Sequence, residues 1–258
     1  MATPNEKLDA SLAQLQMLQG RGRRVFRSGE LTRVHRERLV RNGFLRKVMK
    51  GWLISCGPEA DPSDTTPWIA SAWEFCAAYC TARFGPDWHV SPKQSLLLHA
   101  ENTFTSQEII ICTPRGANNG VRLPFGARLF DLGTNGMPPD SDLAIRDGLR
   151  LLVPEAALVR VPESFYCEYP VEARVALSGI RDASEVLGRL LDGGHSVIAG
   201  RLAGAFRRTG RGGLADEILG TMKRAGYDVR EVDPFEPEQA LGALSRAQPP
   251  IVGRLQSL

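Results

Sequence analysis

The spacing of hydrophobic residues predicts helices at the start of the chain. Four leucines recur at intervals of three or four residues: Leu8, Leu12, Leu15 and Leu18. This period places them on one face of an amphipathic helix over residues 5–18, which Gly20-Arg21-Gly22 would end. Ser28 then stands where it can cap a short helix around residues 29–31. Both helices would belong to a small N-terminal module.

A third helix is predicted over residues 33–42, because Gly43 suits the left-handed position that ends many helices. An inward stripe is expected from three apolar residues: Val34, Leu39 and Val40. The charged residues expected to point away from that stripe are Arg33, Arg36, Glu37 and Arg41. His35 and Arg38 fall at the boundary between the two faces. The outward face of this helix is therefore expected to be basic.

A small hairpin is predicted directly after this helix, with strands over residues 44–48 and 52–55. The residues between them, Met49-Lys50-Gly51, suit a tight turn with glycine at the position that needs a positive φ. A short basic helix followed by a basic hairpin is typical of a winged helix-turn-helix. In that motif the second helix lies in the major groove of DNA, and the hairpin, or wing, contacts the backbone.

The distribution of charge agrees with this interpretation. Residues 1–54 hold twelve Lys and Arg against four Asp and Glu, a net charge of +8. The remaining 204 residues hold 20 bases and 25 acids, a net charge of −5. Positive charge concentrated in one-fifth of a nearly neutral chain indicates a polyanionic ligand. The alternatives are a solvated basic face and a surface that meets an acidic protein.

The whole composition is that of an ordinary globular protein, with 43% hydrophobic and 24% charged residues in 258. The N-terminus lacks a signal-peptide pattern, and no apolar run reaches the length of a membrane span. We therefore expect a cytoplasmic protein that does not enter a membrane. The five cysteines are an odd number without a CxxC pair, which favours reduced thiols and argues against a zinc site.

The rest of the chain predicts a mixture of helices and strands after a Pro-, Gly- and Asp-rich linker at residues 56–67. An apolar helix over residues 68–84 is expected in the core. Further helices are expected over residues 91–99, 154–161, 171–179, 183–191, 196–208 and 214–225. Strands are expected over residues 89–90, 109–113, 121–123, 128–132, 143–146 and 149–152, with an extended piece over 227–232. We expect the strands to form one small mixed sheet.

These elements predict an α+β fold with three parts. Residues 1–57 would form the winged helix-turn-helix, residues 66–180 a mixed α/β domain, and residues 181–258 a C-terminal helical segment. The last ten residues begin a helical pattern and then stop, which is expected of a longer polypeptide cut short.

Motifs that would indicate catalysis are not found in the sequence. The histidines, at positions 35, 89, 99 and 195, fall in separate elements without a neighbouring acid, Ser or Cys in a triad-like or metal-binding pattern. Neither a GxxxxGK[ST] phosphate loop nor a GxGxxG after a strand occurs. We therefore expect neither an enzyme nor a bound metal or cofactor.

The order of several segments resembles a known family. The basic segment SGELTRVHRERLVRNGFLRKVMKGWLI is followed by SPKQSLLLHA, then by LAIRDGLRLLVPEAALVRV, and finally by RLAGAFRRTGRGGLADEILGTMKRAGYDV. This order resembles the AbiEi-type antitoxins of bacterial type IV toxin–antitoxin systems, which act in phage defence, from about Val25 to Val232. The stretch WEFCAAYCTARFGPDWHVSPKQSLLLHA is also similar to N-terminal parts of proteins that continue into a Fic domain.

The resemblance implies a protein with two functions. Its winged helix would bind inverted repeats in its own promoter and repress transcription, as a possible homodimer, and the following region would neutralise a cognate toxin of the nucleotidyltransferase or Fic type. The alternative is a non-catalytic regulatory part of a Fic-type, AMP-transferring enzyme, since the Fic motif HPFxxGNGR is absent from this chain. The DNA contacts implied are Arg33, Arg36 and Arg41, with His35 and Arg38 possible, and Lys47 and Lys50 from the wing.

Overall fold

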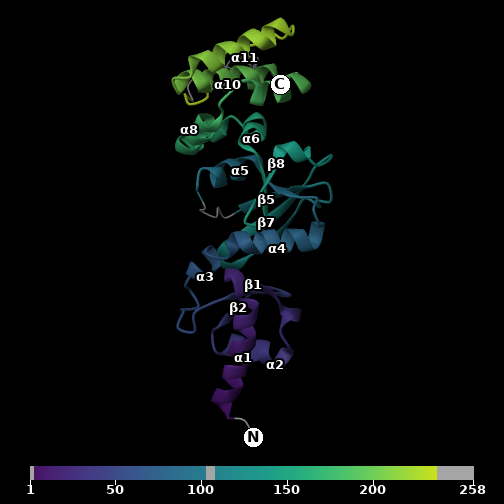
Figure 1. The fold of residues 1–258 in the computed structure, drawn as a ribbon, viewed down its shortest axis with the longest axis vertical. Helices are drawn as coiled ribbons and strands as arrows, with labels where there is room; N and C mark the ends of the chain where they lie inside the picture. Colours follow the sequence, from purple (N-terminus) through teal and green to yellow (C-terminus); the bar gives the residue numbers. More distant parts are fainter. Residues whose placement is uncertain (1–2, 103–107, 237–258) are drawn as a thin grey trace, which may run out of the picture. The chain divides into compact units, whose positions relative to one another are not determined.

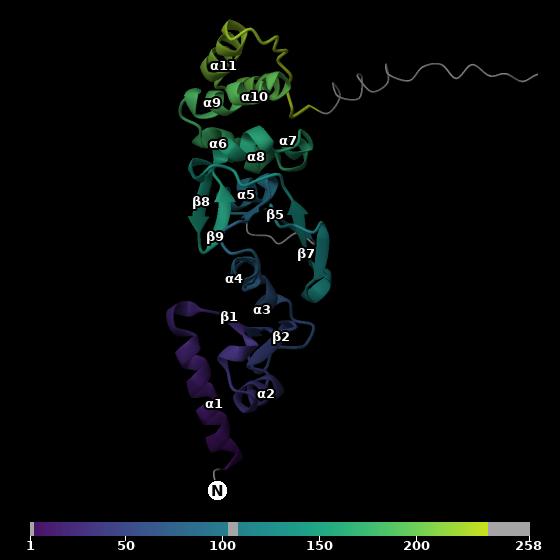
Figure 2. The same cartoon turned by 90° about the vertical axis from the view of Figure 1, so that its right-hand side faces the viewer.

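The structure is a computed structural model that describes residues 3–102 and 108–236 (Figures 1 and 2). The chain is a mixed α+β protein, as the sequence predicts. By compactness it divides into two units, residues 1–153 and 154–258. The expected boundaries near residues 57 and 180 lie inside these units, and the division into three domains remains a prediction. None of the described helices combines the length and apolar character needed to span a membrane.

The N-terminal module of the first unit contains two helices and a three-stranded antiparallel sheet. In chain order its elements are α1 (Pro4–Leu18), the 3-10 turn η1 (Gly20–Gly22), β1 (Val25–Arg27), the 3-10 turn η2 (Ser28–Glu30), α2 (Arg33–Arg41), β2 (Leu45–Met49) and β3 (Trp52–Ser55). The strand order is β1-β3-β2. Thr3 begins α1 with a capping box that includes Glu6, and the Thr32 side chain accepts from the first turn of α2.

A small hydrophobic core holds this module together. Its buried side chains are Leu15, Phe26, Leu31, Leu39, Leu45 and Leu53. Leu12 and Leu18 pack against it, so three of the four leucines predicted for the α1 stripe reach the core, whereas Leu8 is half-buried and is not part of it. The short helix expected near Ser28 is only a single 3-10 turn, and the Ser28 hydroxyl does not cap it. Instead the Glu30 carboxylate accepts from the backbone N–H of Arg27.

The inward stripe predicted for α2 is wrong at two of its three positions. Leu39 is fully buried, but Val34 is 59% exposed and Val40 is 41% exposed. Each residue of an α-helix turns by about 100°, so Val40 lies about 100° and Val34 about 140° around the helix from Leu39. The core is small enough that one leucine fills the side of α2 that meets it.

The rest of the first unit contains two sheets, where one was expected. Its elements are α3 (Thr66–Ile69), α4 (Ala72–Phe84), β4 (His89–Val90), α5 (Pro92–His99), β5 (Glu108–Thr113), β6 (Asn119–Arg122), η3 (Pro124–Gly126), β7 (Arg128–Gly133), η4 (Asp140–Asp142), β8 (Leu143–Arg146) and β9 (Leu149–Leu152). The larger sheet has the order β4-β5-β7-β6, with β5 and β7 parallel, and β8–β9 is a separate hairpin. The Ser91 side chain accepts from the backbone N–H of Gln94 and caps α5, while the Gln94 side chain bonds to the backbone of β5.

The apolar helix predicted over residues 68–84 is two helices, α3 and α4, separated at Ala70 and Ser71. The backbone N–H of Ser71 bonds to the Trp68 carbonyl three residues earlier, so the first helix ends in a tight turn. Its position in the core is confirmed, since Trp68 and Phe75 are buried. Val25, Trp52 and Ile54 of the three-stranded sheet belong to the same cluster. The N-terminal module therefore shares a hydrophobic core with α4.

The described part of the second unit is helical: α6 (Pro154–Arg160), α7 (Ser164–Glu168), α8 (Pro170–Gly179), α9 (Ser184–Asp192), α10 (Ser196–Arg208) and α11 (Gly212–Arg224). The sequence did not predict α7. Residues 227–232 form no strand but run along α10, where Val232 donates to the Gly200 carbonyl. A Cβ at Gly200 would lie 1.9 Å from the Arg230 carbonyl oxygen, so this approach requires glycine. The expectation about the last ten residues lies outside the described part of the chain.

Candidate nucleic-acid interface

The solvent-facing side of α2 carries an exposed row of charged residues. The Arg33 Nε lies 2.7 Å from Glu37 Oε1, one helical turn away, and these side chains are 81% and 53% exposed. This pair raises the pKa of Arg33 and lowers that of Glu37, chiefly through their hydrogen bond. Arg41 is exposed, with no ion-pair or hydrogen-bond partner for its side chain in residues 3–102 and 108–236. An exposed Arg–Glu pair of this kind is weak, so both side chains remain able to exchange partners.

Two of the predicted contacts, His35 and Arg38, face α1 rather than the outward side of α2. His35 Nδ1 lies 2.9 Å from Ser11 Oγ. Arg38 Nη1 donates to the Lys7 carbonyl at 2.6 Å and to Ser11 Oγ at 2.8 Å. Both side chains are half-buried. The structure therefore uses them to hold α1 against α2.

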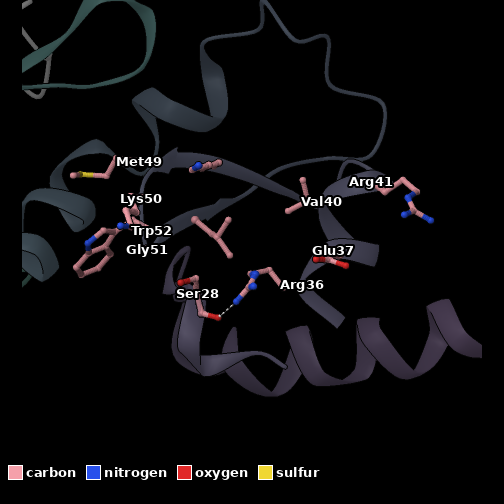
Figure 3. A pocket seen from close by; sticks show the side chains of 11 residues that line it. Ser28, Arg36, Glu37, Val40, Arg41, Met49, Lys50, Gly51 and Trp52 are labelled. Atoms are coloured by element: carbon pink, nitrogen blue, oxygen red, sulfur yellow. Dashed lines mark hydrogen bonds between the residues drawn. The ribbon is translucent and has the colours of Figure 1, made fainter. Parts of the chain in front are cut away.

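Arg36 occupies an intermediate position between these two sets. Its Nη1 donates to the Ser28 carbonyl at 2.7 Å, the bond drawn as a dashed line in Figure 3. This bond ties α2 to the 3-10 turn η2 and leaves the side chain half-buried. The Arg36 side chain lies between α2 and the hairpin (Figure 3).

The β2–β3 hairpin presents two lysines without partners. Met49 pairs with Trp52, so the turn consists of Lys50 and Gly51 and is one residue shorter than predicted. Gly51 has a φ of +86°, as its place in the turn requires. Lys47 and Lys50 are exposed, and their ammonium groups have no ion pair or hydrogen bond within the described residues. A register shift between Lys47 and Met49 marks a β-bulge at this point.

Helix α2 and the hairpin enclose a groove of about 510 Å³ (Figure 3). Four residues of α2 line one side of it: Arg36, Glu37, Val40 and Arg41. Lys47 and Lys50 line the other side, and the Trp52 ring closes one end. Cations from two separate elements therefore converge on one concave surface, which favours binding of an extended anion.

Two further residues of the module were not singled out from the sequence. Arg27 is exposed and its guanidinium carbon lies 5.0 Å from the centre of the Trp52 ring, beside the hairpin turn. It packs on Trp52, but it is not among the residues that line the groove. Arg46 contributes to the basic count but donates to the carbonyls of Asp61 and Asp64, so it anchors the following loop. Only the position of Arg27 next to η2 could have suggested its role.

Outside the N-terminal module, two histidines and two cysteines of the described residues are buried or bonded within the fold. His89 is buried with its Nδ1 at 2.8 Å from the Val90 carbonyl, and His99 Nε2 lies 2.8 Å from the Leu152 carbonyl. Burial raises the pKa of the Cys76 thiol to about 12 and that of Cys112 to about 11, so both are protonated at neutral pH. The five cysteines are free. No three His, Cys, Asp or Glu side chains in the described residues are grouped to hold a metal ion.

Comparisons with known proteins leave the family of this chain open. No family model matches the sequence, and no curated protein matches it. Among solved structures, the chain is similar to the one described as the crystal structure of RV2827C protein from Mycobacterium tuberculosis. The two are 18% identical, with 87% of this chain and 83% of that chain covered and a TM-score of 0.47. A likeness at this level carries no argument about family or function.

Proposed function

We propose that this protein binds double-stranded DNA through a winged helix-turn-helix formed by its first 57 residues. In this proposal α2 enters the major groove and the β2–β3 hairpin acts as the wing that contacts phosphates. The observation that carries it is the convergence of Arg41, Lys47 and Lys50 on one groove, with no partner for any of them in the described chain. Cations held at one surface without a counter-charge favour an external polyanion.

The order of elements supports the same proposal. Helix α1, strand β1, turn η2 and helix α2 precede the hairpin, and the sheet order β1-β3-β2 places the hairpin beside β1. The backbone N–H of Ser28 bonds to the Gly51 carbonyl at 2.9 Å, which fixes the turn of the hairpin relative to η2. The helix expected to read bases and the hairpin expected to meet the backbone are thus each hydrogen-bonded to Ser28 of η2.

The chemistry of the side chains suggests that the arginines and the lysines contact different parts of the DNA. Arg33 and Arg41 can each pair with guanine through two parallel hydrogen bonds, while Lys47 and Lys50 suit phosphate oxygens. Arg36 would reach DNA with the N–H groups that it does not use on Ser28. Since His35 and Arg38 bond to α1, they support α2 in this proposal rather than contact bases.

A salt titration of DNA binding tests this function directly. The full chain is titrated with fluorescent duplex from the region upstream of its own coding sequence, at several salt concentrations. About five phosphate contacts predict a slope of log K against log salt of roughly −4 to −5. Arg33→Ala and Arg41→Ala should each cost about 1–3 kcal/mol on the preferred sequence. Arg181→Ala, an exposed arginine of the second unit, is the control. No affinity for duplex, or an affinity indifferent to salt, would refute the proposal.

The resemblance to AbiEi-type antitoxins extends the proposal to regulation. In this extension the protein acts in the cytoplasm, represses its own promoter at inverted repeats, and neutralises a toxin of the nucleotidyltransferase or Fic type. The support is the order of sequence segments alone. Co-expression with the product of the neighbouring gene tests it: rescue of growth and a stable complex are expected. A Fic motif in that product, with a complex but no change in DNA binding, would instead favour a regulatory part of a Fic-type enzyme.

A further inference from the structure

Helix α2 exposes two large apolar side chains on its otherwise charged outer surface. Val34 is 59% exposed and Val40 is 41% exposed. Single exposed apolar residues are common on proteins, but valine is a poor choice for an exposed helical position. Its branched side chain loses rotamer freedom in a helix, and neither valine gains core packing in return. Their place on the surface proposed to meet DNA therefore needs another reason.

The two valines are placed symmetrically about the centre of that surface. Glu37 lies at its middle, and residues three before and three after it are rotated by about 60° in opposite directions around the helix. These residues are Val34 and Val40. Arg33 and Arg41 lie four residues away from Glu37, about 40° to either side. A groove-filling ligand that meets the arginines would therefore also touch the valines.

We infer that Val34 and Val40 read thymine through its 5-methyl group. This inference rests on the proposed function, in which α2 lies in the major groove. The methyl of thymine is the apolar group that unmodified base pairs present on that edge, and apolar side chains recognise it by contact. Guanine and cytosine offer hydrogen-bonding groups there, for which Arg33, Arg41 and Glu37 are the suitable partners. The preferred half-site should therefore hold thymines beside the guanine that an arginine reads.

The positions of the two valines predict separate thymines. Val34 stands in the first turn of α2 and is not among the residues that line the groove, whereas Val40 stands in the last turn and lines the groove next to the hairpin. The helix spans nine residues, and each residue advances it by about 1.5 Å. The valines are six residue steps apart, which separates them by about 9 Å along the axis, more than two base-pair steps. One thymine cannot serve both.

Uracil substitution isolates this contact. The full chain first selects its preferred duplex from a random pool, and each thymine of that duplex is then replaced by uracil in turn. The replacement removes one methyl group and leaves every hydrogen-bonding group in place. Burial of one methyl-sized group contributes about 0.8 kcal/mol, so binding should weaken about fourfold at two thymines. At the other thymines it should not change.

Valine variants then assign each thymine. Val34→Ala should abolish the effect of uracil at one position and Val40→Ala at the other, because the protein side of the contact is gone. Alanine is the better helix former, so weaker binding would not reflect a loss of α2, and circular dichroism checks this. Met17→Ala is the matched control, since Met17 is 76% exposed on α1. Its uracil profile should equal that of the unchanged protein.

The outcomes separate this inference from the function on which it rests. A protein that binds its selected duplex but tolerates uracil at every thymine keeps the proposed function and overturns the inference. A valine variant that retains the full uracil profile also overturns the inference. A variant that loses only the complex with the toxin overturns it too, and would assign the valines to a protein contact. Failure to bind any duplex overturns both.

Discussion

Two hairpins of the first unit turn through only two residues, and they differ in whether their charged side chains have partners within the protein. Both β2–β3 and β8–β9 are antiparallel, and both turn through two residues that end in glycine, Lys50-Gly51 and Asp147-Gly148. In β8–β9 both turn residues have positive φ, +50° for Asp147 and +78° for Gly148, and the register is regular. In β2–β3 only the glycine has positive φ, and the register shifts beside the turn.

The arginine beside the turn of β8–β9 is matched within the protein. Arg146 donates to the Leu98 carbonyl at 2.9 Å and to both carboxylate oxygens of Glu101 at 2.8 Å. The lysines of the first hairpin have no such partners in the described parts of the chain. A cation with an internal partner fastens the fold, while one without a partner is available to a ligand. The same supersecondary structure therefore serves stability in one place and, in our proposal, binding in the other.

The largest expected effect comes from removing the unpartnered lysines. Lys47→Ala with Lys50→Ala should reduce the salt slope of DNA binding by about two, since each phosphate contact contributes about 0.9. At 0.15 M salt this corresponds to binding on the order of 30-fold weaker, on all sequences alike. Fluorescence anisotropy measures it. Asp147→Asn in the other hairpin should leave affinity unchanged, because asparagine keeps the turn. An equal loss of DNA affinity in both variants would contradict the distinction between the two hairpins.

Replacement of the turn glycines should show what the hairpins have in common. Gly51→Ala and Gly148→Ala each force an alanine into positive φ, at a cost of about 1–2 kcal/mol in the free energy of unfolding. Urea denaturation of both variants measures this loss. Only Gly51→Ala should also weaken DNA binding, since it distorts the wing. If Gly148→Ala weakened binding as much, the assignment of the wing to β2–β3 would be wrong.

Arg146→Ala should give the smallest effect, and on stability alone. The ion pair with Glu101 is partly exposed and contributes little, so the lost bond to the Leu98 carbonyl dominates, at about 1 kcal/mol. Lys50→Ala is the counterpart and should leave the free energy of unfolding within about 0.5 kcal/mol. A drop in DNA affinity for Arg146→Ala without a drop in stability would contradict the distinction drawn between the hairpins.

Elements fixed by local turn chemistry could be predicted from the sequence. The bounds predicted for β3, β8, β9 and α10 agree with the structure, and turn glycines or an Asp-Gly pair flank most of them. The break between α3 and α4 could not be predicted, because Ser71 carries no helix-breaking signal and its burial depends on distant residues. The helix α7 is five residues long and offers too little periodicity to detect.

The candidate site was predictable as a region, but the role of each cation was not. Helix α2 and the hairpin follow from the pattern of residues 33–55. Yet Arg38 bonds to a carbonyl 31 residues away and Arg46 to carbonyls 15 and 18 residues away. The packing of α1 and of the loop after β3 decides those bonds, and no local pattern reveals it. The exposed valines were missed because one leucine is enough to fill the core side of α2.

Trp52 follows the hairpin turn directly, and its ring meets Phe75 of α4 edge to face at 5.6 Å between centroids. The back of the lysine-bearing hairpin thus rests on a helix that the chain reaches only after the loop at residues 56–65. A fragment that stopped at that loop would leave the indole in water. The N-terminal module is therefore not self-contained: an engineer who moved it into another protein would also have to move α4.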